Sequence, residues 1–352
     1  MSISKIPLPD VLESLDYETI LAERKARLIT LAEAQYKSSG EEDKLQLLEQ
    51  TLATESDPLV KLLQESAYRE LLLRQRVNDA ARAVMLPLAK GTDLDNLGSL
   101  FGAHRGTLLD GNNEGDEPYR ERLLLAPKSL STAGSKAAYK FHALSAGNQS
   151  DSITIESATD SALTVSFHYA SQQNLVKDAT IESPEPCVVN IYVLGFEQYG
   201  SIDADGIDKI GLYLSDDRVR PVGDRVTVTA ADIVKYQLQL KLNLVPELEG
   251  SPQVELIIQH VRDQLVLFVS EHHFLGKAIR YSTLLGVISP LIDGWVELTM
   301  IKNGETLSEG ADLLITSGQA AHLDLTGTDV DLTWPQRLAA QIEQSIEVTY
   351  DG

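Results

Sequence analysis

The chain has 352 residues, enough for two or three domains, and 43% of them are hydrophobic, which excludes wholesale disorder. It carries 52 Asp and Glu against 30 Lys and Arg, a formal net charge of −22, so nucleic acid and anionic membranes are poor partners. The single cysteine, Cys187, excludes an intramolecular disulfide framework and a zinc site built from several cysteines.

No segment has the composition of a signal peptide or of a membrane span. The first ten residues have no apolar run behind their lysine, and no uncharged stretch approaches the roughly 18 residues that cross a bilayer. We therefore expect a soluble protein made in the cytosol, without membrane insertion.

The first hundred residues carry helical patterns. Residues 17–37 lack Gly and Pro and place Ile20, Leu21, Leu28 and Leu31 at helical spacing. Shorter helices are expected at about residues 45–52 and 93–101.

Residues 57–91 give the strongest local signal. Asp57 is a good N-cap, Pro58 suits the first helical position, and Gly91 is expected to close the helix, with Pro87 kinking or ending its last turn. The apolar residues of this stretch form a stripe too broad for one neighbour, so they are candidates for a protein interface. An ordinary core helix of its own domain is the alternative. The candidates are Leu59, Leu63, Ala67, Tyr68, Leu71, Leu73, Val77, Ala81, Val84 and Leu88.

Beyond a polar loop at residues 110–118 and a helix at 132–146, the hydrophobic period changes from 3.6 to 2. Strands are expected near residues 163–169, 189–193, 226–228, 236–244 and 295–301, with helices at 205–214, 252–269 and 283–292. Their order predicts an α+β fold in which a mostly helical N-terminal module precedes a split βαβ, ferredoxin-like module. The predicted parts are residues 1–109, a linker helix and inserted hairpin or lobe at 110–175, an α+β domain at 176–302, and an extension at 303–352.

The sequence predicts no catalytic, cofactor or metal site. His272 and His273 fit a helix C-terminus, and Asp203 with Asp205 fits a helix N-cap better than an incomplete calcium loop. Cys187 has no basic neighbour that would make its thiol reactive, which favours a small buried or edge side chain. Pairs of acidic residues are expected by chance in so acidic a chain, and they do not by themselves identify an active site. The residues therefore favour a protein that binds other proteins, and a hydrolase that uses an acid pair is the alternative.

Several blocks of the sequence together resemble the phage baseplate assembly protein J family. They occur in order over most of the chain, which is more specific than any single motif. The blocks are DYETILAERKARL at 16–28, ESDPL at 55–59, QESAYRE at 64–70, RQRVNDAARAVML at 74–86, GTDLD at 91–95, LG at 97–98, FG at 101–102, TAGS at 132–135, AY at 138–139, HALSA at 142–146, VRPV at 219–222 and DRVTV at 224–228.

The resemblance implies a non-enzymatic wedge subunit in the baseplate of a contractile phage tail, tailocin or injection system, assembled in the bacterial cytoplasm. The implied partners are a second copy and other wedge proteins, together with sheath-initiator, hub and tail-fibre proteins; no cofactor is implied. Residues 149–174 look inserted relative to the family, and residues 303–352 match it loosely, so partner contacts in these regions are not carried over.

Overall fold

The structure is a computed structural model that describes residues 12–39, 41–108, 111–131, 134–146, 152–159, 162–168, 174–196, 200, 202–217, 219–329 and 331–350. The chain forms two compact units, Met1–Gly102 and Ala103–Gly352. None of the helices in these ranges combines the length and apolarity needed to cross a membrane. The finer four-part division stays a prediction.

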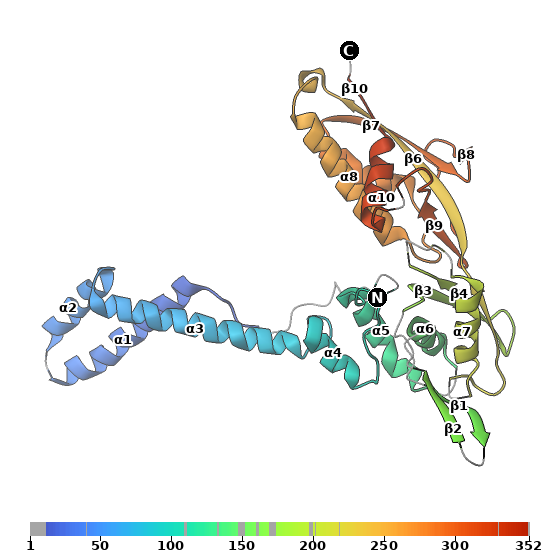
Figure 1. Ribbon diagram of the computed structural model, residues 1–352. Coiled ribbons are helices and arrows are strands. Elements are labelled where there is room, and N and C mark those ends of the chain that lie inside the picture. The colour runs from blue at the N-terminus through green and yellow to red at the C-terminus, as the bar shows by residue number, and fades with distance from the viewer. Residues whose placement is uncertain are drawn as a thin grey trace. The chain divides into compact units, whose positions relative to one another are not determined.

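The first unit is helical (Figure 1). It contains α1 (Tyr17–Ser39), α2 (Glu42–Ala53), α3 (Pro58–Ala83) and α4 (Gly91–Ser99). The predicted start of α3 is confirmed, because the Asp57 side chain accepts a hydrogen bond of 2.8 Å from the Leu59 amide and Pro58 is the first helical residue.

The predicted end of this helix is wrong. α3 stops at Ala83, four residues before Pro87, where the proline ring would clash with the Ala83 carbonyl if the helix continued. A turn follows, in which the Leu88 amide donates to the Met85 carbonyl at 2.9 Å. Gly91 has φ of +51° and begins α4 rather than closing α3.

The second unit begins with α5 (Asp116–Ser129) and α6 (Lys136–Ser145). A three-stranded sheet of order β3-β4-β5 follows, formed by β3 (Asp178–Glu182), β4 (Val188–Leu194) and β5 (Arg225–Ala230). β3 is antiparallel to β4, and α7 (Ala204–Leu214) connects β4 to the parallel β5. The side chains of α6 and α7 share one apolar core with this sheet, with Tyr139, Ile191 and Ile210 among its buried members.

The central strand of the second sheet is β6 (Asp232–Leu244). It pairs antiparallel with β7 (Gly294–Lys302), whose last residues pair with β8 (Glu305–Thr306). β9 (Gln319–Leu323) and β10 (Ile346–Tyr350) pair in parallel with the two ends of β6. The helices of this part are α8 (Gln253–His272), α9 (Tyr281–Ile288), α10 (Trp334–Gln344) and the short 3-10 segments Pro246–Leu248 and Ser289–Leu291. Leu265 of α8 and Leu338 of α10 are fully buried in the core that they share with Leu240.

The α+β class is confirmed, but the strands pair differently from a single ferredoxin-like sheet. β4, α7 and β5 belong to one sheet, and β6, α8 and β7 belong to another. β7 pairs with one side of β6 from Tyr236 to Leu244, while β9 and β10 pair with the two ends of its other side; β4 and β5 pair with neither side. Only Ala231 separates β5 from β6, and the chain passes directly from one sheet to the next.

Residues of the predicted insertion form β1 (Ser152–Thr159) and β2 (Ala162–His168), an antiparallel pair that makes a sheet of its own. Gln149 and Tyr169, which bound the predicted insertion and its strand, lie outside the described residues. Asn174 does not belong to a surface lobe, because it is 1% exposed and its backbone N–H donates to the Thr107 carbonyl at 2.8 Å.

Candidate assembly surface

One face of α3 is covered by α1 of the same chain. Ala67 is fully buried against Ile20 and Leu21, and Leu63 and Leu71 pack at the border of this cluster. The two helices run antiparallel, since Glu13 contacts Asn78 while Arg24 contacts Ser66. This face therefore belongs to the core of the first unit.

Polar contacts fix α1 on α3. The guanidinium of Arg24 donates to the Ser66 hydroxyl at 2.6 Å and to the Glu70 carboxylate, which also accepts from Arg74 at 2.6 Å. The hydrogen bonds from Arg74 and Arg24 hold the pKa of the Glu70 carboxyl below its usual range. Glu70 is thus ionised at neutral pH and sits between two cations.

The other face of α3 leaves large apolar side chains exposed. Leu73 is 66% exposed, Val77 53% and Val84 69%. Intervals of four and seven residues place these three on one side of the helix. Tyr68 is also exposed, and Leu62, three turns before Leu73, extends the row although it is not among the predicted candidates.

The predicted interface candidates therefore fall into three groups. Ala67 is buried inside the chain, so the contact it makes is intramolecular. A second group is half-buried, namely Leu59, Leu63, Leu71, Ala81 and Leu88. Only Tyr68, Leu73, Val77 and Val84 offer a large exposed apolar surface. We keep the name α3 stripe for Leu62, Leu73, Val77 and Val84.

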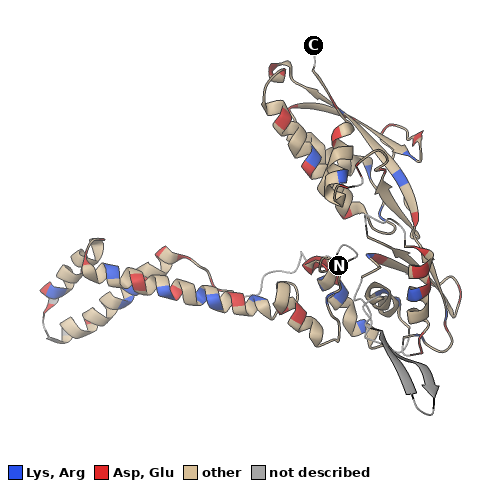
Figure 2. Cartoon of the chain, viewed as in Figure 1, with Lys and Arg blue, Asp and Glu red and all other residues tan. Residues whose placement is uncertain are grey.

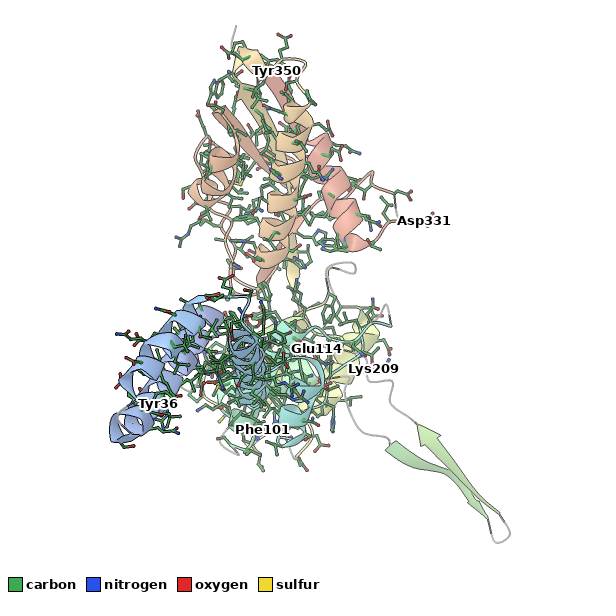
Figure 3. The ribbon with its side chains drawn as sticks, turned by 90° about the vertical axis from the view of Figure 1, so that its left-hand side faces the viewer. Tyr36, Phe101, Glu114, Lys209, Asp331 and Tyr350 are labelled. Atoms are coloured by element: carbon green, nitrogen blue, oxygen red, sulfur yellow. The ribbon has the colours of Figure 1, made fainter. Side chains whose placement is uncertain are left out.

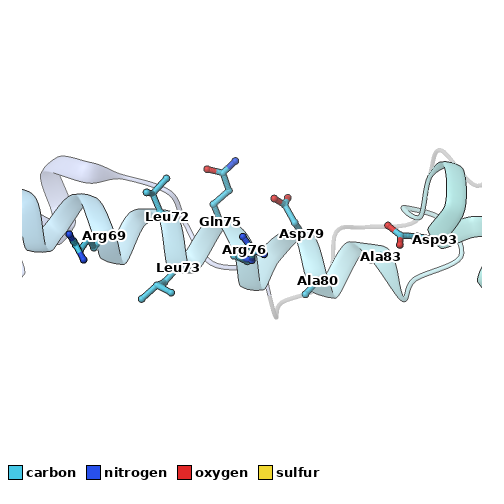
Figure 4. A pocket seen from close by; sticks show the side chains of 9 residues that line it. All are labelled: Arg69, Leu72, Leu73, Gln75, Arg76, Asp79, Ala80, Ala83 and Asp93. Carbon is cyan, nitrogen blue, oxygen red and sulfur yellow. The ribbon is translucent and has the colours of Figure 1, made fainter.

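A shallow groove of about 870 Å³ runs beside the α3 stripe. Leu72, Leu73 and Ala80 supply apolar walls, and Figure 4 shows the charged Arg69, Arg76, Asp79 and Asp93 along the same groove. Both signs of charge occur along α3 (Figure 2). An apolar strip with a rim of mixed charge is typical of a surface that pairs with another helix.

The other candidates of the sequence have structural roles in the described parts of the chain. Asp203 caps α7, accepting a hydrogen bond of 2.9 Å from the Gly206 amide, and His272 ends α8, as predicted. Cys187 is exposed in the turn just before β4. Within the described residues, no group of three or more His, Cys, Asp or Glu is placed to hold a metal ion.

Sequence similarity to known proteins indicates the family of this chain. Residues 55–112, which contain α3 and α4, match the Baseplate J-like N-terminal domain. The chain is 36% identical over 331 residues to "Baseplate protein J" of Escherichia phage P2, covering 91% of this chain and 94% of that protein. A baseplate chain of the anti-feeding prophage matches with 14% identity and a TM-score of 0.31, over 43% of this chain and 34% of that one. Because this identity extends over nearly the whole of both proteins, the chain belongs to the baseplate protein J family.

Proposed function

We propose that the chain is a wedge subunit of a contractile-tail baseplate and that the α3 stripe packs against helices of neighbouring subunits. Membership of the baseplate J family makes it a structural protein of the tail baseplate. The observation that supports the finer proposal is the α3 stripe itself, which lies in the family-matched stretch and exposes four aliphatic side chains by more than half. Burying one such side chain is worth about 1.5–3 kcal/mol.

The proposed partners are a second copy of the chain and other wedge proteins, with sheath-initiator, hub and tail-fibre proteins at further contacts. The acidic chain, with its net charge of −22, favours basic surfaces on these partners. Assembly is proposed to take place in the bacterial cytoplasm, before the baseplate becomes part of the tail.

The proposed mechanism is mechanical. A ring of wedges stores a metastable arrangement, and packed helices change between discrete arrangements rather than deforming continuously. Loss or exchange of the contacts at the α3 stripe would then be part of the rearrangement that releases contraction. We propose no catalytic role, and the comparisons give the hydrolase alternative no support.

Charging the α3 stripe tests this proposal. Leu73→Asp with Val77→Asp should abolish co-purification of the chain with its co-expressed baseplate proteins, because two charges would have to be buried unpaired. Leu47→Asp changes another leucine of the first unit, 64% exposed on α2, and serves as the matched control. Both variants should melt like the unaltered chain. Normal assembly of the doubly charged chain would contradict the proposal.

A further inference from the structure

β7 has two different edges. Its full length pairs with β6 on one side, from Gly294 opposite Leu244 to Lys302 opposite Tyr236. On the other side, the β8 pairing reaches only Ile301 and Lys302. The part of β7 before these two residues is therefore an edge that no strand in the described part of the chain covers (Figure 1).

The backbone groups on this edge alternate. The Asn303 amide donates to the Lys235 carbonyl, so the odd-numbered residues of β7 direct their N–H and C=O groups toward β6. The even-numbered residues direct their N–H and C=O groups toward the open side, as the bond from the Leu307 amide to the Met300 carbonyl shows. Among the described residues, the N–H and C=O groups of Val296 and Leu298 on that side have no partner strand.

A groove lies along this edge. It measures about 470 Å³ and is lined by residues 295–300 of β7 and by residues 306–309 with Ala311. Tyr281, Trp295 and Leu307 supply its apolar surfaces. A strand residue occupies roughly 3.4 by 4.8 by 10 Å, so the groove holds about three residues of one extended chain.

The groove also selects the kind of occupant. Because residues 306–309 and Ala311 also line it, it has room for a single strand but not for the edge of a second folded sheet. Glu297 and Glu309 line it and no Lys or Arg does. Their carboxylates favour basic side chains on the incoming segment.

We propose that the open edge of β7 binds one extended segment with basic side chains from a different protein, which adds to the sheet beside Val296 and Leu298. This mode of recognition takes its affinity from main-chain hydrogen bonds and its specificity from side-chain pockets. Uncovered edges promote unwanted pairing, and natural proteins usually block them. The inference concerns the second unit and does not depend on the α3 stripe; it uses the baseplate assignment only for where the partner is found.

Hydrogen exchange resolved to single residues tests the proposal on the full chain. The first probe is a capped five-residue peptide of alternating Lys and Val, at millimolar concentration. Bound peptide should slow exchange of the Val296 and Leu298 amides about tenfold, while the Glu297 and Thr299 amides, already bonded to β6, change little. A peptide with Glu in place of Lys should protect them less.

N-methylated peptides separate strand addition from loose adhesion. Methylating one alternate set of peptide nitrogens should abolish the protection, and methylating the other set should leave it, because only one set faces β7. Equal effects of the two sets, or no protection by the Lys-Val peptide, would overturn the proposal. Protection that instead rises with the concentration of the chain alone would identify a second copy as the occupant and would also overturn it.

The second arm uses the chain in assembled baseplates purified from co-expression. The same two amides should be protected there relative to the free chain. Val296→Pro removes the outward amide at a position that the β6 ladder does not use, and Val296→Thr keeps it. With both variants melting normally, only the proline variant should fail to join the baseplate. Unprotected amides in the baseplate, or normal incorporation of the proline variant, would contradict the proposal even if the α3 stripe behaves as proposed.

Discussion

The side chain of Asn78 binds the backbone of Glu13 with two hydrogen bonds. Its oxygen accepts from the Glu13 amide and its nitrogen donates to the Glu13 carbonyl, each at 2.9 Å. Asn78 is 2% exposed, so these bonds replace the solvation that its amide loses on burial. The pair ties the segment before α1 to the later turns of α3.

Asn78→Ala should therefore destabilise the first unit by about 1–3 kcal/mol, since it leaves both backbone groups of Glu13 without their partner. Urea unfolding followed by circular dichroism measures the change. Asn96→Ala, at an exposed position of α4, is the control and should leave the midpoint unchanged. Equal midpoints for the two variants would show that the Asn78 contact has no role in stability.

The second unit contains a buried ion pair. Arg122 is 2% exposed and donates at 2.5 Å to the Glu114 carboxylate and at 2.7 Å to the His104 carbonyl. Glu114 also accepts from the Gly106 amide. Together with the Arg122 bonds, this contact ties the segment before α5 to that helix. Figure 3 draws the side chains as sticks and labels Glu114, which precedes α5, and Lys209 of α7.

Replacing Arg122 with Leu should cost about 3–5 kcal/mol of unfolding free energy, because the Glu114 carboxylate is left buried without its cation. The exposed pair Lys209–Asp205 gives the contrast, and Lys209→Met should produce no measurable change. A small effect of Arg122→Leu, comparable with that of Lys209→Met, would mean that the buried carboxylate finds other solvation.

The burial of two histidines, His142 and His272, predicts that the free energy of unfolding depends on pH. Burial lowers the pKa of His142, whose Nδ1 lies 3.0 Å from the Tyr213 hydroxyl, and that of His272, which stacks on Phe268. Their folded pKa values lie below the unfolded value of about 6.5, so the unfolded chain binds more protons in mildly acidic solution. The stability that these two histidines contribute is therefore fully present above pH of about 6.5 and is lost as the pH falls through their folded pKa values.

Unfolding free energies measured at a series of pH values check this. His142→Asn should flatten the acid side of the profile, and His260→Asn, at an exposed position of α8, should not. A profile with the same slope for the unaltered chain and His142→Asn would rule out His142 as a source of the pH dependence.

The β1–β2 pair should be dispensable for folding. Within the described residues its strands pair only with each other, and a change in the length of a surface loop alters closure entropy by only about 0.6 kcal/mol per doubling. Deleting residues 149–173 should leave the thermal midpoint of the monomer unchanged and affect only the assembled particle. Deleting residues 149–174 should destabilise it, because Asn174 is buried and bonded to Thr107. If deletion of residues 149–173 unfolds the monomer, the hairpin is part of the core and the prediction is wrong.

The start of a helix could be predicted from the sequence where the signal is local, but the end of α3 was placed too late. Asp57 and Pro58 mark the start of α3 directly, and the steric effect of Pro87 on Ala83 accounts for its end. No helix is predicted at α5, whose start overlaps the predicted loop at residues 110–118 and whose Pro118 and Pro127 are untypical of a helix. Its buried residues Tyr119, Leu123 and Ala126 recur at helical intervals, and a proline in the first turn removes no intrahelical hydrogen bond.

Strand pairing was harder to predict, because it depends on contacts between distant residues. β9 and β10 share β6 as their neighbour, although about a hundred residues separate them from it. A local signal for α10 was present in Thr333 and Gln336, which form a capping box. The division of α3 into a covered and an open face followed from α1, which the hydrophobic pattern of α3 alone does not reveal.

Labelling of engineered cysteines tests the central claim, that the α3 stripe is buried in the baseplate. In a Cys187→Ser background, Val77→Cys and the control Leu47→Cys should both react quickly with a water-soluble maleimide in the free chain, since both positions are exposed. In the assembled baseplate, Val77→Cys should become protected while Leu47→Cys keeps reacting. Equal labelling of Val77→Cys in the free chain and in the baseplate would contradict the claim.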